Sequence, residues 1–118
     1  MQQYSAQWWA AVLDKWNASS EADQMARLGT TSFAVLDSSL PAVAIHWDER
    51  GQGHLLPSGT SAPLRFEATA SDWRAFIDGE FNAAMGVLTR RIRLIGNPVA
   101  VLPYTAAFNQ LAKVSRYA

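Results

Sequence analysis

Two histidines and two aspartates are the side chains of this 118-residue sequence best suited to chemistry. His46 and Asp48 are two residues apart, so they would lie on the same face of a strand. They would supply half of a metal site or an acid–base pair, with His54 as a further ligand. Asp37 is the alternative base for an enzyme. A metal needs three or four ligands, and the chain has no cysteine. We therefore interpret these residues as polar surface, and predict no catalytic residue, no metal and no cofactor.

Three arginines form the one basic cluster, at Arg90, Arg91 and Arg93. Charge that alternates with Ile92 and Leu94 is typical of the solvated side of a strand, and contact with lipid headgroups is the alternative. Ten basic residues balance ten acidic ones. A chain with no net charge lacks the electrostatic footprint of a nucleic-acid-binding protein, so that class of partner is excluded.

The last third of the chain has many large apolar side chains on short predicted helices and strands. These side chains must pack against one another or against a bound molecule. Helical spacing usually means that such residues complete a core. The other interpretation is that they enclose an apolar ligand. The residues concerned are Trp73, Phe76, Ile77, Met85, Leu88, Val101, Phe108 and Leu111.

The first half of the chain must provide helices and then strands. Apolar residues at helical spacing predict a helix from about Ser5 to Trp16, and Ser20 with Asp23 predicts a capping box for a short second helix. Because Trp8 and Trp9 are adjacent, we expect one of them to lie at a surface, a partner interface or the lip of a cavity. Alternating patterns then predict strands over residues 33–37, 43–48, 53–56 and 64–69.

The second half carries clear signals for helix ends. Thr69 with Asp72 predicts another capping box, Asn82 and Asn97 are expected caps, and Pro103 should interrupt the last helix. A last strand is expected over residues 91–95. The order and length predict one α+β domain, residues 1–118, with a mixed, mainly antiparallel sheet of about five strands and helices on one face.

Part of this order resembles a known family. A tryptophan follows Ser-Asp, residues 76–84 read Phe-Ile-Asp-Gly-Glu-Phe-Asn-Ala-Ala, and residues 91–97 read Arg-Ile-Arg-Leu-Ile-Gly-Asn before a helix with Phe108 and Leu111. This run resembles the sterol carrier protein type 2 family, above all its short prokaryotic members. The specific part covers Asp72 to Gly96. Two positions depart from the family pattern: Arg90 replaces a glycine, and Pro98 follows Asn97.

The resemblance implies an apolar tunnel between the sheet and the terminal helices. Its expected lining is Phe66, Trp73, Phe76, Ile77, Met85, Leu88, Leu94, Val101, Phe108 and Leu111. The predicted function is to bind and carry one lipid-like molecule, such as a fatty acid, a fatty acyl thioester or a terpenoid. The alternatives are a ligand-free interaction domain that acts through a patch around Trp8, and a small enzyme with His46 or Asp37 as base.

Two further expectations concern location and partners. The sequence begins without the features of a signal peptide and contains no run long enough to span a membrane, so we expect a cytoplasmic protein. Transient contact with a membrane and a homodimer both stay open.

Overall fold

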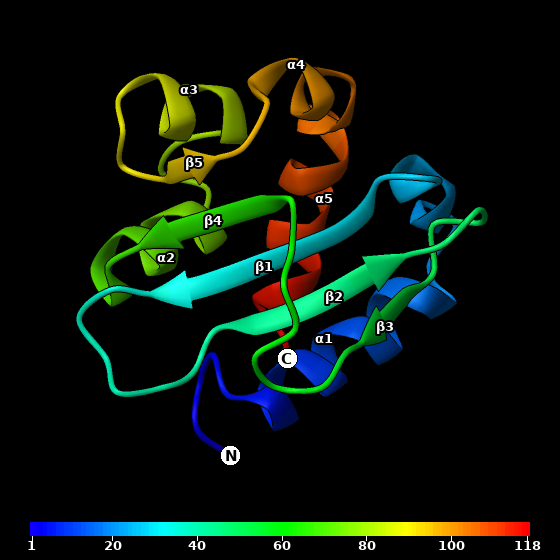
Figure 1. Cartoon of the computed structure of the whole chain (residues 1–118), viewed down its shortest axis with the longest axis horizontal. Coiled ribbons are helices and arrows are strands. Elements are labelled where there is room, and N and C mark those ends of the chain that lie inside the picture. Colours follow the sequence, from blue (N-terminus) through cyan, green and yellow to red (C-terminus); the bar gives the residue numbers. More distant parts are fainter.

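A mixed five-stranded sheet with helices on one face is the frame of the protein, which the computed structural model describes over residues 1–118 (Figure 1). The strands are β1 (Gly29–Val35), β2 (Val43–Trp47), β3 (Gly53–Leu55), β4 (Leu64–Ala68) and β5 (Arg93–Ile95). The helices are α1 (Ala6–Ala18), α2 (Ala70–Ile77), α3 (Ala83–Leu88), α4 (Pro98–Val101) and α5 (Thr105–Ser115), with the 3-10 turns η1 (Ala22–Met25) and η2 (Leu102–Tyr104). The predicted fold class is confirmed.

The strand order is β3-β2-β1-β4-β5, and only the central β1–β4 pair is parallel. Strands β1, β2 and β3 are consecutive antiparallel neighbours, whereas β4 pairs with β1 and not with β3. The connection over residues 56–63 crosses the outer face of the sheet and brings β4 beside β1 (Figure 1). The parallel strands β1 and β4 are joined by the whole segment of residues 36–63, which is longer than the dozen or so residues that a parallel connection needs.

Side-chain caps fix most helix starts where the sequence predicts them. Thr69 Oγ1 accepts from the Asp72 N–H at 3.2 Å, Asn82 Oδ1 accepts from Met85 at 2.8 Å, and Asn97 Oδ1 accepts from Val99 at 3.0 Å. Each cap satisfies a backbone donor that the first turn of a helix leaves free. Pro103 lies in η2, which separates α4 from α5 as expected.

The capping box predicted at Ser20 is wrong. The segment forms the single 3-10 turn η1, which follows Glu21 and has no side-chain cap. Met25 on this turn is fully buried, so packing, and not a cap, holds the segment in place.

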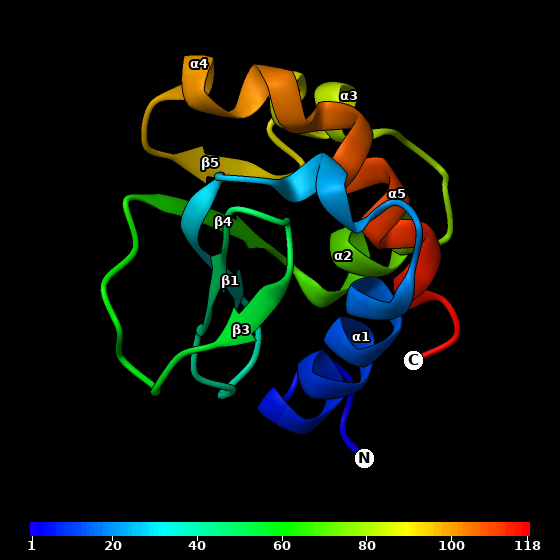
Figure 2. The same ribbon diagram turned by 90° about the vertical axis from the view of Figure 1, so that its right-hand side faces the viewer.

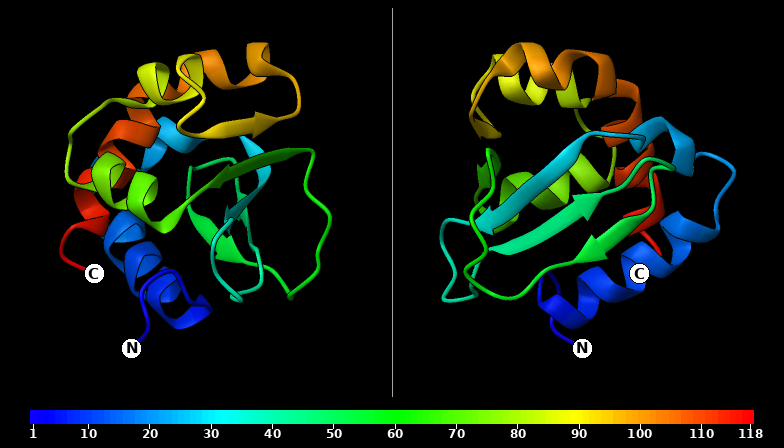
Figure 3. Two further views of the ribbon diagram at one scale, coloured as in Figure 1. Left: turned by 90° about the vertical axis from the view of Figure 1, so that its left-hand side faces the viewer. Right: turned by 45° about the vertical axis from the view of Figure 1, so that its right-hand side comes forward.

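Helices α1, α2 and α5 lie on one side of the sheet, and the connection between β3 and β4 lies on the other (Figure 2). Both chain ends are on the helical side (Figure 3). Two indoles close the half of the core under β2 and β3. Trp16 and Trp47 meet edge to face at 6.1 Å, and their N–H groups donate to Gly51 O and Thr31 Oγ1, each at 3.0 Å. No helix is both long and apolar enough to cross a bilayer.

Candidate functional site

A small apolar cavity lies in the other half of the core, between β1, β4 and the helices. Of its 17 lining residues 15 are hydrophobic, and its volume is about 40 Å³. A water molecule needs roughly 10–15 Å³ measured in this way, and drug-sized pockets exceed about 300 Å³. The cavity thus has room for about three or four waters, and it is too small in this structure to be the expected tunnel. Its aromatic lining consists of Tyr4, Trp8, Trp9, Phe33, Phe66, Trp73, Phe76 and Phe108.

Aromatic rings fill the space that a ligand would take. Trp9 stacks on Phe33 at 4.6 Å, Phe33 stacks on Phe66 at 5.5 Å, and Phe66 meets Phe108 at 4.9 Å. Offset stacking and tilted contacts of this kind stabilise a core beyond the area they bury. The rings come from a helix, two central strands and the last helix, so a ligand can enter only if these elements separate or the rings turn.

Six of the ten predicted site residues line the cavity. They are Phe66, Trp73, Phe76, Ile77, Phe108 and Leu111. Trp73 is fixed by a hydrogen bond from its indole N–H to Ala34 O at 2.9 Å. The helical and strand periodicity was sufficient to place these side chains on the inner face.

Two predicted site residues point the other way. Met85 is 47% exposed and Leu88 is 78% exposed, so their expected inward orientation is wrong. The reason is close packing of the six-residue helix α3. Its inner side is formed by Ala83 and Gly86, and a Cβ at Gly86 would lie 2.7 Å from the Phe81 ring. Only small residues fit there, which turns the large ones outward.

The remaining two predicted residues belong to the core but not to the cavity wall. Leu94 lies opposite Phe66 in the β4–β5 ladder and is partly buried, while Val101 is buried at the end of α4. Neither is among the residues that line the cavity.

The N-terminal aromatic residues are the part of the wall that the sequence analysis missed. Trp8 and Trp9 are both buried, 4% and 7% exposed, and both line the cavity. Of the three expected positions, the one at the surface is therefore wrong. The segment before α1 folds back, and the ring of Tyr4 covers Trp8 at 5.2 Å. The spacing of four between Tyr4 and Trp8 was a usable signal, but Tyr4 lies outside the predicted helix.

One polar group in this wall has no partner. The Tyr4 hydroxyl is the one buried side-chain polar atom without a hydrogen bond, whereas the buried Ser115 hydroxyl donates to Leu111 O at 2.8 Å. Burial raises the pKa of Tyr4 above its usual value. Two smaller effects act in opposite directions, because Arg74 lowers this pKa and Asp78 raises it. The hydroxyl therefore stays protonated and can donate.

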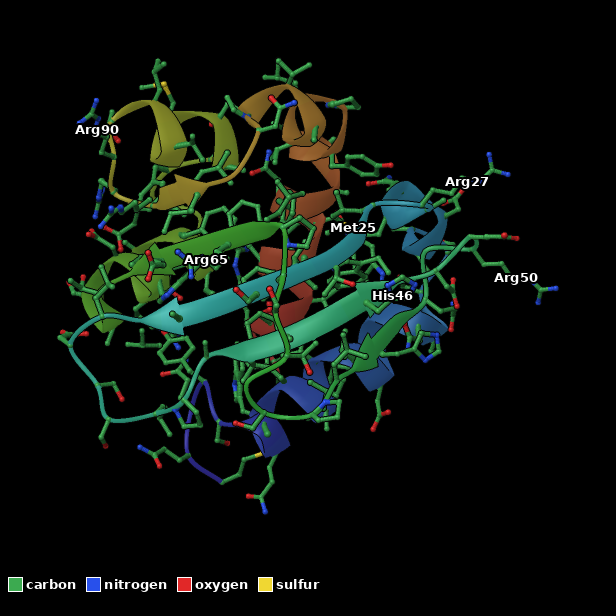
Figure 4. The ribbon with its side chains drawn as sticks, viewed as in Figure 1. Met25, Arg27, His46, Arg50, Arg65 and Arg90 are labelled. Carbon is green, nitrogen blue, oxygen red and sulfur yellow. The ribbon has the colours of Figure 1, made fainter.

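The histidines lie on the outer face of the sheet, away from the cavity. His46 and His54 oppose each other in the β2–β3 ladder, and His54 Nε2 lies 2.8 Å from Asp48 Oδ2. The hydrogen bond with His54 holds the pKa of Asp48 below its usual value. No group of three potential ligands is placed to hold a metal ion. Figure 4 shows His46 on this outer face.

The catalytic alternative finds no site here. Asp37 is exposed and accepts a hydrogen bond from the Ala70 N–H at 2.8 Å, at the start of α2. Neither Asp37 nor His46 lines the cavity, so no base from the hypothesis faces the apolar space.

A second surface feature lies at the end of the molecule formed by α3 and α4 (Figure 1). Four large apolar side chains are exposed on it, Met85, Leu88, Val99 and Leu102, the last two by about two-thirds. Arg90 projects away from the body beside them (Figure 4). We call these five residues the α3–α4 patch. Arg91 is instead held by Asp72 at 2.9 Å and lies over the Phe81 ring.

Comparison with known proteins gives a structural match. No protein-family model and no curated sequence matches the chain. A crystal structure of sterol carrier protein 2 is similar at a TM-score of 0.79 and 21% identity, covering 98% of both chains. A conserved hypothetical protein of Thermus thermophilus, suggested to be a sterol carrier protein, is similar at a TM-score of 0.76 and 22% identity. The match covers 99% of this chain and 90% of that one.

A ubiquinone synthesis protein, UbiJ-SCP2, is similar at a TM-score of 0.61 and 16% identity, over 88% of this chain and 90% of the other. Identities this low establish the architecture and not the ligand. These similar structures agree with the family that the sequence resembles and with the mixed five-stranded sheet. The protein therefore has the sterol carrier protein 2 fold.

Proposed function

We propose that this protein binds one lipid-like molecule in the cavity and carries it in a form shielded from water. The observation that carries the proposal is the enclosed apolar wall between the sheet and α1, α2 and α5. Similar structures named sterol carrier proteins support it. Burial of about 300 Å² of an acyl chain or terpenoid would contribute on the order of 7 kcal/mol before the costs of binding and opening. The ligand class is a fatty acid, a fatty acyl thioester or a terpenoid.

A groove beside the cavity suggests the route of access. It has a volume of about 310 Å³ and runs between the α2–α3 connection and α5. Phe76 and Ala112 line both the groove and the cavity. Rotation of the Phe76 ring, with movement of α2 or α5, would join the two spaces. Asn109 and Lys113 lie in the groove and would provide polar contacts at the mouth.

Ligand capture is tested on freshly purified protein. Native mass spectrometry is expected to show an apolar adduct, and delipidated protein should take up a fluorescent fatty acid with a micromolar Kd. A clean mass of the free chain combined with no uptake of the fatty acid would count decisively against carriage.

The small volume of the cavity favours one other candidate, a ligand-free interaction domain with a collapsed tunnel. Burial of Trp8 removes the surface patch on which that hypothesis first rested. A concentration-dependent homodimer in sedimentation velocity, together with no uptake of fatty acid, would support this second candidate.

Delivery requires contact with a membrane, and we propose that the α3–α4 patch makes it. Charge supports this choice of partner. Residues 81–118 contain five basic residues and no acidic one, whereas residues 1–80 contain five basic and ten acidic residues. The zero net charge of the whole chain therefore conceals a positive C-terminal third. Exposed apolar side chains next to positive charge suit the surface of an anionic bilayer.

Binding to vesicles tests the patch. Co-sedimentation with vesicles of 30% phosphatidylglycerol in phosphatidylcholine is expected for the parent and should weaken as salt rises. Leu88→Asp combined with Leu102→Asp should reduce binding by about tenfold or more, because two anchors are lost and two negative charges added. Leu36→Asp is the matched control, since Leu36 is also an exposed leucine, 54% exposed, but lies after β1. Equal loss in both variants would contradict the assignment.

A further inference from the structure

Tyr4 combines two unfavourable features that the fold alone does not require. The residue is only 8% exposed, its hydroxyl has no partner, and its backbone has a φ of 68°. A buried unpaired hydroxyl loses its hydrogen bonds to water and gains nothing in return. A left-handed backbone is also costly for any residue with a Cβ. Such costs collect at ligand-binding positions more often than elsewhere.

The local structure holds the Tyr4 ring inward. The Ser5 N–H and the Ser5 hydroxyl both donate to Gln2 O, at 3.2 and 2.6 Å, which closes a turn around Tyr4. Ser5 Oγ also caps α1 by accepting from the Trp8 N–H at 3.2 Å. The Tyr4 ring then packs edge to face against Trp8, 5.2 Å away and at 65°. Tyr4 is thus a residue of the cavity wall, and its hydroxyl is buried and not on the surface.

We infer that the Tyr4 hydroxyl recognises the ligand by donating a hydrogen bond to a single carbonyl-type acceptor on an otherwise apolar molecule. The inference rests on the proposed function and adds the chemistry of the ligand. A ketone, an ester or a carboxylic acid would satisfy the hydroxyl, whereas a pure hydrocarbon would leave it unpaired. A site built to hydrogen-bond a ligand discriminates against analogues that lack the polar group.

Other polar groups of the wall do not compete for this role. The Ser115 hydroxyl is already used, because it donates to Leu111 O. The indole N–H of Trp73 donates to Ala34 O. The remaining wall is formed largely by apolar side chains, so a carbonyl that enters the cavity finds its donor at Tyr4.

The test is Tyr4→Phe, which removes only the hydroxyl. Two probes of one shape are used, 2-undecanone and 2-methyl-1-undecene, in which a CH₂ group replaces the carbonyl oxygen. Their affinities are measured by displacement of a fluorescent fatty acid. The parent should bind the ketone about tenfold more tightly than the alkene, and Tyr4→Phe should bring this ratio close to one. Without ligand, Tyr4→Phe should raise the Tm by roughly 3–6 °C, because a buried unpaired group is removed.

Tyr104→Phe is the matched control. The Tyr104 hydroxyl donates to Ala26 O at 2.8 Å and does not line the cavity. This variant should lower the Tm and leave the ratio of the two affinities unchanged. An unchanged ratio in Tyr4→Phe, or a fall in its Tm, would overturn the inference while leaving the proposed function in place. Failure of the ketone to displace the fatty acid from the parent would overturn the inference alone. Failure of the fatty acid itself to bind would overturn the proposed function, and the inference with it.

Discussion

Replacement of Gly51 by alanine is expected to cost about 3 kcal/mol or more of the free energy of unfolding, a large share of the roughly 5–15 kcal/mol typical of a domain. Gly51 has a φ of 81°, and an added Cβ would lie 1.8 Å from the Ala22 carbonyl oxygen. Backbone atoms cannot turn aside as a flexible side chain does. Movement of the turn would also disturb the bond from Trp16 Nε1 to Gly51 O. Urea denaturation measures the effect.

Gly59→Ala separates the two causes. Gly59 has nearly the same φ, 84°, but no atom lies within 4 Å of its added Cβ. The Gly59→Ala variant should lose about 1 kcal/mol of its free energy of unfolding, which is the ordinary cost of an alanine in the left-handed region. If the two variants were equally stable, the close approach of the β2–β3 turn to η1 would not contribute to folding.

Local signals were the predictable part of this fold. Three side chains cap helices by accepting from a backbone N–H only two or three residues later, those of Thr69, Asn82 and Asn97. Pro103 ends a helix because it lacks an N–H. The alternation of apolar residues likewise placed Phe66 on the inner face of β4. Such features depend on neighbours in the sequence, so one chain is sufficient to recognise them.

Features that depend on how side chains pack in three dimensions were not predictable in the same way. The inner face of α3 is set by the Phe81 ring and Ile92, which leave space only for Gly86, so Leu88 turns to solvent. The burial of Trp8 depends on Tyr4, which a helix pattern does not include. The position of β4 beside β1 depends on a long connection, and the composition of this connection does not predict its path.

One signal was present in the sequence and was overlooked. The total charge is zero, but all ten acidic residues lie before Phe81. Asymmetry between the two parts of a chain suggests a charged surface and a partner of opposite sign, even when the sum vanishes. Arg90 beside the exposed apolar residues of α3 and α4 belongs to this basic part of the chain.

The two halves of the core differ in a way that bears on function. Under β2 and β3, Trp16, Trp47 and Ile45 are fully buried. Under β1 and β4, stacked rings surround the remaining void, and the groove beside α5 shares Phe76 with it. A ligand would therefore displace rings in the second half while the first half keeps the sheet and α1 together.

Phe108→Ala is expected to make this difference measurable. Without ligand the variant should lose about 3–5 kcal/mol, because the ring that meets Phe66 at 4.9 Å leaves an enlarged void. An apolar void that stays dry can accept an apolar guest. Decanoate at about 100 times its Kd should then restore roughly 2.7 kcal/mol, more than it adds to the parent, whose rings must first be displaced. Thermal unfolding with and without decanoate measures both effects.

Ile45→Ala is the control for any hole in the core. Ile45 is fully buried on β2 but does not line the cavity. Truncation of its side chain should lower the free energy of unfolding by a comparable ~2–5 kcal/mol. Decanoate should stabilise this variant no more than it stabilises the parent. If both variants were restored equally, the fatty acid would be filling any defect, and the void under β1 and β4 would have no special role. If neither were restored, the aromatic wall would be ordinary core, because a ring removed from a ligand site should leave room for the ligand.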